Sequence, residues 1–199
     1  MYQEQIDELI GFVTSEGRED DIAMAKKEYF SEGGGIFGDE ISYDMRIGSF
    51  LEWYVIDRRK GGKSIIEEYT EKMEDPEKKE IFLSLGDGTR SIFEITGKYR
   101  DSINLKDLHG GKKYLVYIPE GILQFKTKNI LDARIFSEGK RYVMSPSYIF
   151  HPEQMKKFII SMLKTAAVGD DLNRAIIRLA NMSLRAEKYG KFRIEEIYK

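Results

Sequence analysis

Five short β-rich runs between Arg90 and Met144 constrain the fold more than any other feature of this 199-residue sequence. They are rich in β-branched and aromatic residues, and turn signals such as Gly110-Gly111 and Glu138-Gly139 separate them. Five such strands favour a small antiparallel β-barrel of SH3-like or OB-like type. A curled, open antiparallel sheet is the simpler alternative. The runs are S-I-F-E-I-T, S-I-N-L-K, K-Y-L-V-Y-I, N-I-L-D-A-R-I-F and K-R-Y-V-M.

Helical patterns lie on both sides of these runs. Apolar residues at helical spacing predict helices over about 3–15, 19–31, 41–58, 65–73 and 76–85, and again over about 152–167 and from Asp170 or Asp171 to Tyr189. The fold class is therefore predicted to be α+β. We expect an acidic helical region at 1–88, a small β-barrel module at 89–150, and C-terminal helices at 151–199 that pack on the rest.

Charge is distributed unevenly along the chain. Residues 1–88 hold 11 basic and 22 acidic side chains, a balance of −11, whereas residues 89–146 hold 11 and 6, a balance of +5. Two explanations stay open at this point. The basic part packs against the acidic helices of the same chain, or it faces an anionic partner.

Two glycine motifs resemble nucleotide-binding loops but stand in the wrong context. The G-G-K-S sequence at 61–64 ends like a P-loop, yet the position that needs the first glycine holds Asp57. Ser64 and Glu67 have instead the spacing of a helix capping box. The G-x-G-x-x-G match at 33–38 follows a polar, helix-like segment rather than a buried strand. We therefore expect an interhelix loop there and no nucleotide cofactor.

Little in the sequence indicates a metal site or covalent catalysis. The chain has no cysteine, and its two histidines, His109 and His151, lack nearby ligands at metal-binding spacing. We expect surface or capping roles for both histidines, and no metal. Aspartate and glutamate are too numerous to nominate an acid–base pair. An enzyme with a carboxylate-based site is therefore an alternative that the sequence neither favours nor removes.

The segment S-F-L-E-W-Y-V-I-D-R-R at 49–59 is the most distinctive in the chain and contains its only tryptophan, Trp53. On a helix, Trp53 and Asp57 lie one turn apart. A core helix with one polar edge accounts for this pattern. The functional interpretation is that Trp53, Asp57 and Arg58 line a groove against the β module.

This segment, with the S-I-F-E-I and I-N-L-K-D-L-H-G-G-K-K-Y runs, resembles an uncharacterised family of prokaryotic proteins. In that family an F-x-E-W-[FY]-x-x-D-R-like helix precedes a small β module. The resemblance covers about residues 50–145. It implies the domain layout and no established activity.

Cations are interleaved with aromatic rings in the β-rich region. Barrels that bind single-stranded nucleic acid use cations for phosphates and rings for base stacking. Because a charge of +5 is modest, a non-catalytic protein-interaction or adaptor module is the preferred function, and binding of single-stranded RNA by the β module is the second. The candidate binding surface comprises Trp53, Asp57, Arg58, Lys98, Tyr99, Arg100, Lys112, Lys113, Lys140 and Arg141.

The preferred partner is another protein or a second copy of the chain. The acidic N-terminal segment lacks the features of a signal peptide, and no apolar stretch has the length of a membrane helix. Together with the absence of cysteine, these features predict a cytoplasmic protein that does not contact membranes.

Overall fold

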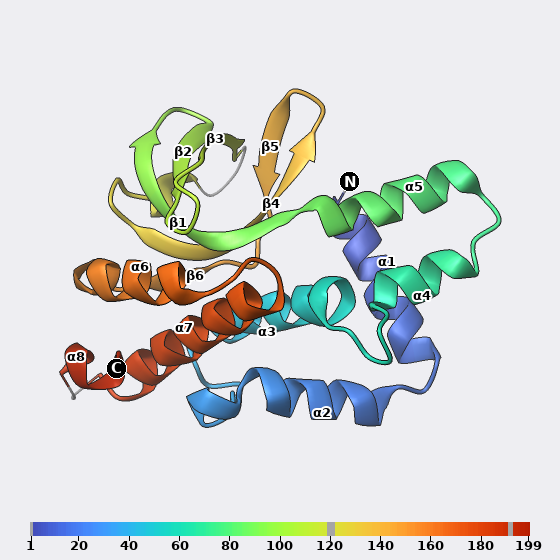
Figure 1. Cartoon of the computed structure of the whole chain (residues 1–199), viewed down its shortest axis with the longest axis horizontal. Coiled ribbons are helices and arrows are strands. Elements are labelled where there is room, and N and C mark those ends of the chain that lie inside the picture. Colours follow the sequence, from blue (N-terminus) through green and yellow to red (C-terminus); the bar gives the residue numbers. More distant parts are fainter. Residues whose placement is uncertain (1, 119–121, 191–192) are drawn as a thin grey trace.

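Helices surround one side of a small barrel in the computed structural model, which describes residues 2–118, 122–190 and 193–199 (Figure 1). The predicted α+β fold class is confirmed. Among the described residues, no helix combines the length and apolar content needed to cross a membrane. The helices are α1 (Tyr2–Ser15), α2 (Glu19–Tyr29), α3 (Tyr43–Glu52), α4 (Ile65–Glu71), α5 (Pro76–Ser84), α6 (Lys156–Thr165), α7 (Asp170–Lys188) and α8 (Ile194–Ile197), with short 3-10 turns at Ser31–Gly33, Leu85–Asp87, Ile122–Gln124 and Glu153–Met155.

Five strands close into a ring in the order β1-β2-β3-β5-β4, because β4 also pairs with β1. All five coincide with the β-rich runs of the sequence. A sixth strand, which the sequence did not predict, pairs with β4 outside the ring and leads into α6. The strands are β1 (Thr89–Lys98), β2 (Ser102–Asp107), β3 (Lys113–Tyr117), β4 (Ile130–Glu138), β5 (Arg141–Met144) and β6 (Ile149–His151).

The expectation of a purely antiparallel barrel is wrong for one pair of strands. β3 and β5 run parallel, with Val116 opposite Tyr142 and Tyr117 opposite Val143. A closed ring with an odd number of strands cannot alternate direction throughout, so at least one neighbouring pair has to be parallel. Of the two predicted barrel types, this order, with β4 placed between β5 and β1, is that of the OB-type Greek-key barrel.

Alternation along β1 and β4 separates the barrel interior from a helix-covered face. Phe93 and Leu131 point inward and join the apolar cluster inside the barrel. The outward residues Ile92 and Ile130 pack in a second cluster with α6 and α7, and Phe136 joins the core of the N-terminal helices. Figure 1 shows α6 and α7 beneath the β1 and β4 side, with β2, β3 and β5 on the opposite side.

The helix predicted over 41–58 changes character near its end. α3 stops at Glu52, and Trp53–Asp57 form a π-helix, in which the Arg58 amide donates to the Trp53 carbonyl at 2.9 Å. This five-residue spacing inserts one extra residue into the turn. Four consecutive residues, Trp53 to Ile56, are buried, which one face of a regular α-helix does not allow.

The Ser64–Glu67 capping box is confirmed, and it explains the G-G-K-S sequence. The Ser64 side chain accepts from the Glu67 amide, and the Glu67 carboxylate accepts from the Ser64 amide at 2.7 Å. The Ser64 hydroxyl is therefore occupied in starting α4.

The surface or capping role expected for His151 is wrong. His151 lies in β6, is 5% exposed, and its Nδ1 is 3.2 Å from the Tyr198 hydroxyl. Burial, and to a lesser extent the charge of Arg46, lowers the pKa of His151 to about 3. The expectation rested on the position of His151 directly before Pro152. The sequence does not show that α7 and the C-terminal segment cover this strand.

We expect the His151→Asn variant to lose less stability in acid than the native chain. Below the ordinary histidine pKa of 6.5, the unfolded chain binds a proton at His151 that the folded chain excludes until about pH 3. Falling pH therefore favours unfolding, and from pH 7 to pH 5 this site removes about 2 kcal/mol of unfolding free energy. Urea unfolding at both pH values measures the difference. His109→Asn is the control and should retain the full native loss; equal losses in all three proteins would contradict the expectation.

Candidate functional site

A network of buried charges joins the outer face of β1 and β4 to the helices. Arg90 and Arg134 lie directly opposite each other on the two strands. Arg90 donates to Asp132, with 3.0 Å between Nη2 and Oδ2, whereas Arg134 donates to Asp57 and lies 3.7 Å from Glu52. Because adjacent guanidinium groups repel each other, the three carboxylates are needed to hold both arginines in this position.

The surroundings of the network raise the pKa values of both Arg90 and Glu52, which favours the charged form of Arg90 and the neutral form of Glu52. Burial, the largest single effect, would lower the pKa of Arg90, but the attraction and hydrogen bond of Asp132 together with the attraction of Tyr29 and Asp57 outweigh it, and the pKa is raised. Burial raises the pKa of Glu52, although Arg134 and a hydrogen bond from Ser145 oppose the shift. The network therefore depends on each guanidinium keeping its carboxylate.

Tyr29 extends the network into the helical core. Its hydroxyl accepts from Arg90 Nη2 at 2.8 Å and lies 3.0 Å from the Ser49 hydroxyl of α3. Of the two explanations of the uneven charge, packing of the basic part against the acidic helices holds for the buried arginine Arg134. Arg134 of the basic region is neutralised by Glu52 and Asp57 of the acidic region, within the same chain.

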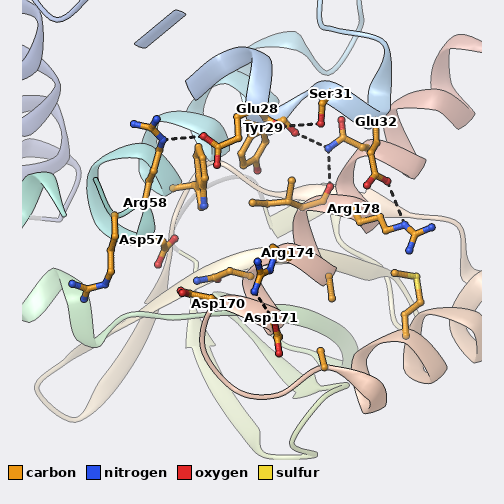
Figure 2. Close-up of a pocket in the computed structure, with 18 of the residues that line it drawn as sticks. Glu28, Tyr29, Ser31, Glu32, Asp57, Arg58, Asp170, Asp171, Arg174 and Arg178 are labelled. Carbon is orange, nitrogen blue, oxygen red and sulfur yellow. Dashed lines mark hydrogen bonds and ion pairs between the residues drawn. The ribbon is translucent and has the colours of Figure 1, made fainter. Parts of the chain in front are cut away.

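A pocket of about 630 Å³ opens next to this network, between the end of α2, the π-helix, and the junction of α6 with α7. Figure 2 shows the Glu28–Arg58 pair at one end and the Glu32–Arg178 pair at the other. The pocket volume lies within the range of small-molecule sites. Among the residues that the structure describes, no group of three or more His, Cys, Asp or Glu side chains is arranged to hold a metal ion.

Asn181, which lines the pocket, packs closely against Gly33. A Cβ atom at Gly33 would lie 2.5 Å from Asn181 Oδ1, so only glycine allows this close approach. The Asn181 amide donates to the Tyr29 carbonyl at 2.7 Å and to the Ile177 carbonyl at 2.9 Å. The glycines that imitate a dinucleotide motif therefore include one that seats the end of α2 against α7.

The structure brings Trp53, Asp57 and Arg58 together on the wall of this pocket. The opposite wall is α7, and not the β module as expected from the sequence. Of the three side chains, Asp57 contacts the barrel, through Arg134. Sequence reasoning missed Asp170 of α7, which also lines the pocket, because an acidic residue at a helix start is ordinary.

The other seven candidate residues lie apart from the pocket, on the outer surface of the barrel, and all are exposed. Lys98 ends β1, and Tyr99 and Arg100 follow it in the β1–β2 turn. Lys140 lies in the β4–β5 turn, and Arg141 begins β5. Lys112 and Lys113 lie at the start of β3. The acidic helices do not cover these cations, so the second explanation of the charge asymmetry remains open for them.

Sequence reasoning missed outward residues of β2 and β3 that connect these turns. Lys106 lies opposite Lys113, and Asn104 lies opposite the exposed Leu115. Tyr117, at the end of β3, lies under the Arg141 guanidinium, 4.6 Å from its ring centroid. The alternation of apolar and polar residues along each β-rich run identifies these positions as outward-facing, but the sequence does not show which side of the barrel the helices leave uncovered.

A family model matches residues 14–173, so the chain belongs to the family of unknown function DUF7986. The matched range contains the π-helix, the whole barrel and the start of α7. The predicted membership of an uncharacterised family is confirmed. No curated protein and no solved structure matches the chain.

Replacing Arg134 should destabilise the protein far more than replacing an exposed arginine. Arg134→Met leaves Glu52 and Asp57 without their buried partner, and we expect a loss of about 3–5 kcal/mol in unfolding free energy. Arg141→Met removes the exposed pair with Glu138 and should cost less than about 1 kcal/mol. Denaturant unfolding compares the two. Similar losses would show that the buried network does not hold the helices to the barrel.

Proposed function

We propose that this protein binds single-stranded nucleic acid on the outer face of β2 and β3. This β2–β3 face consists of the outward residues Ser102, Asn104, Lys106, Lys113, Leu115 and Tyr117. OB-type barrels bind oligonucleotides on this face and on the loops that join β1 to β2 and β4 to β5. In this chain the first loop carries Tyr99 and Arg100, and the second carries Lys140, with Arg141 directly after it at the start of β5.

Rings and apolar side chains for base stacking lie along the middle of the β2–β3 face. Leu115 is 57% exposed and Tyr99 is 54% exposed, although neither is needed to complete the core. The Tyr99 hydroxyl accepts from Asn104 Nδ2 at 3.0 Å, which holds the ring beside the strand pair. Arg141 covers Tyr117 and adds a guanidinium plane. A base has a π-face whatever its identity, so such a surface binds without strong sequence preference.

Cations without acidic partners surround these rings, and this observation carries the proposal. In the described part of the chain, Arg100, Lys106, Lys112, Lys113 and Lys140 form no ion pair within 4.0 Å. Internal neutralisation thus accounts for the buried Arg90 and Arg134, but it does not account for these exposed side chains. Phosphates of a single strand carry the opposite charge and would neutralise these side chains.

The protein-interaction or adaptor module that the sequence favoured stays a prediction, as do a protein partner, a homodimer and a cytoplasmic location. The nucleic-acid proposal is preferred because it uses a face, a set of rings and a set of cations that occur together. A carboxylate-based enzyme has no comparable support.

Neutralising two lysines of the β3 start should weaken binding in a salt-dependent way. We expect Lys112→Gln/Lys113→Gln to bind a fluorescent single-stranded oligouridylate about tenfold more weakly at low salt. If each lysine contacts one phosphate, the slope of log K against log salt concentration should fall by about 1.4. Fluorescence anisotropy over a salt series measures both.

The matched control neutralises two exposed lysines of α6, Lys157→Gln/Lys164→Gln, which makes the same change in net charge outside the β2–β3 face. Its affinity and salt slope should equal those of the native chain. Equal effects of the two double variants, or no binding by the native chain at low salt, would reject the proposal and leave the protein-interaction prediction.

Removing the Tyr99 ring should cost binding energy that removing its hydroxyl does not. Tyr99→Ala loses one stacking surface, so we expect about 1–3 kcal/mol weaker binding to the same strand. Tyr99→Phe keeps the ring and loses only the hydrogen bond from Asn104, so it should bind nearly as the native chain does. Equal losses in the two variants would argue against stacking.

A further inference from the structure

Trp53 lines the pocket beside the π-helix and carries a hydrogen-bond donor that has no partner among the described residues. Its side chain is almost entirely buried, at 6% exposed, and it lines the pocket. Within the described chain the indole N–H makes no hydrogen bond, yet this atom is not among the polar atoms sealed from solvent. A buried donor normally has a partner. The pocket therefore contains a position suited to a hydrogen-bond acceptor from outside the chain.

The arginines of the pocket are already neutralised by carboxylates. Arg58 pairs with Asp21 and Glu28, and Arg59 pairs with Glu67. The other two ion pairs join Arg174 to Asp171 and Arg178 to Glu32. These cations are therefore not free to act as an anion site.

Two carboxylates of the pocket have oxygen atoms that accept no hydrogen bond from the described residues. Asp170, at the start of α7, has no hydrogen-bond or ion-pair partner among the described residues, and it lines the pocket together with Asp57 (Figure 2). Asp57 binds Arg134 through Oδ2, while its Oδ1 accepts no hydrogen bond and is not sealed from solvent. The charge that remains uncompensated in the pocket is negative. Asp57 lies on the same wall as Trp53, and Asp170 lies on the opposite wall, at the start of α7.

We propose that this pocket binds a guanidinium compound that also carries a carbonyl or carboxylate oxygen, that is, arginine either free or as a residue of a peptide. The planar guanidinium donates to the carboxylates of Asp57 and Asp170, the pairing in which its geometry fits best. The oxygen of the ligand accepts from the Trp53 N–H. The volume of about 630 Å³ exceeds what a metal ion needs and suits an amino-acid-sized ligand.

This inference is independent of nucleic-acid binding, because the pocket and the β2–β3 face share no residue. Trp53 is the only tryptophan of the chain, so its fluorescence reports on this pocket alone. The test is a fluorescence titration of the full chain with L-arginine and with N-acetyl-L-arginine amide. L-citrulline, in which a neutral urea replaces the guanidinium, is the ligand control.

We expect saturable fluorescence changes with at least one arginine compound and none with citrulline. Binding of L-arginine alone identifies the free amino acid as the source, and binding of the amide alone identifies an arginine residue of a peptide. Binding of both shows that the pocket recognises the guanidinium and the carbonyl oxygen that the two share. Each of these results supports the proposal. Titrations of both that show no saturation in the millimolar range, or an equal response to citrulline, would overturn it.

Asp170→Asn provides the matched variant, because the residue is exposed and the change removes only its charge. We expect at least tenfold weaker binding of the arginine compound. Asp20→Asn, also an exposed carboxylate in the first turn of a helix, should bind within twofold of the native chain. Trp53→Phe keeps an aromatic ring without the N–H, and calorimetry should show weaker binding by this variant too. Native affinity in Asp170→Asn would overturn the proposal.

Discussion

The arrangement of this protein depends on the need to neutralise Arg90 and Arg134, which lie side by side on the outer face of the barrel. Two adjacent guanidinium groups cannot stay charged and buried unless carboxylates approach them. One carboxylate, Asp132, comes from the barrel itself, but Glu52 and Asp57 come from the helical part. The helices therefore supply charge as well as apolar surface, and the barrel alone would leave Arg134 without a carboxylate partner.

The same requirement explains the π-helix. In a continuous α-helix, the residue after Ile56 would point about 100° away from its present direction, since each residue advances by that angle. The extra residue in the Trp53–Asp57 turn keeps four residues in the core and still directs Asp57 to Arg134. π-Helical turns are frequent at functional sites, and here the turn also forms a wall of the pocket. Core packing and the pocket thus share one irregular segment.

The sequence contained most of the fold but little of the tertiary pairing. The five barrel strands and the capped helix at Ser64 follow from local signals, which are alternation, turn residues and side-chain spacing. The π-helix does not, because it depends on an ion pair between Asp57 and Arg134, which lie 77 residues apart. The burial of His151 was missed for the same reason. Trp53, Asp57 and Arg58 were selected because a single tryptophan is conspicuous, whereas Asp170 resembles any acidic helix start.

Because the helices cover β1 and β4, they determine which side of the barrel remains available. The β2–β3 face carries its exposed rings and lysines on the uncovered side, where neutralisation by the acidic helices is out of reach. The chain thus separates two uses of positive charge. Arg90 and Arg134 are buried in ion pairs, and those of Arg134 hold the barrel and the helices together, whereas the exposed lysines contact solvent and are accessible to a ligand.

Asp57 both holds the helices to the barrel through Arg134 and lines the pocket. One of its oxygens holds Arg134, whereas the other accepts no hydrogen bond and is not sealed from solvent, and the residue lines the pocket. A cation bound there draws on the same carboxylate that holds the barrel to the helices. A ligand that binds only the folded chain also stabilises it, by an amount set by its concentration relative to its dissociation constant. Occupancy of the pocket and the stability of the joint between helices and barrel are therefore linked through this one side chain.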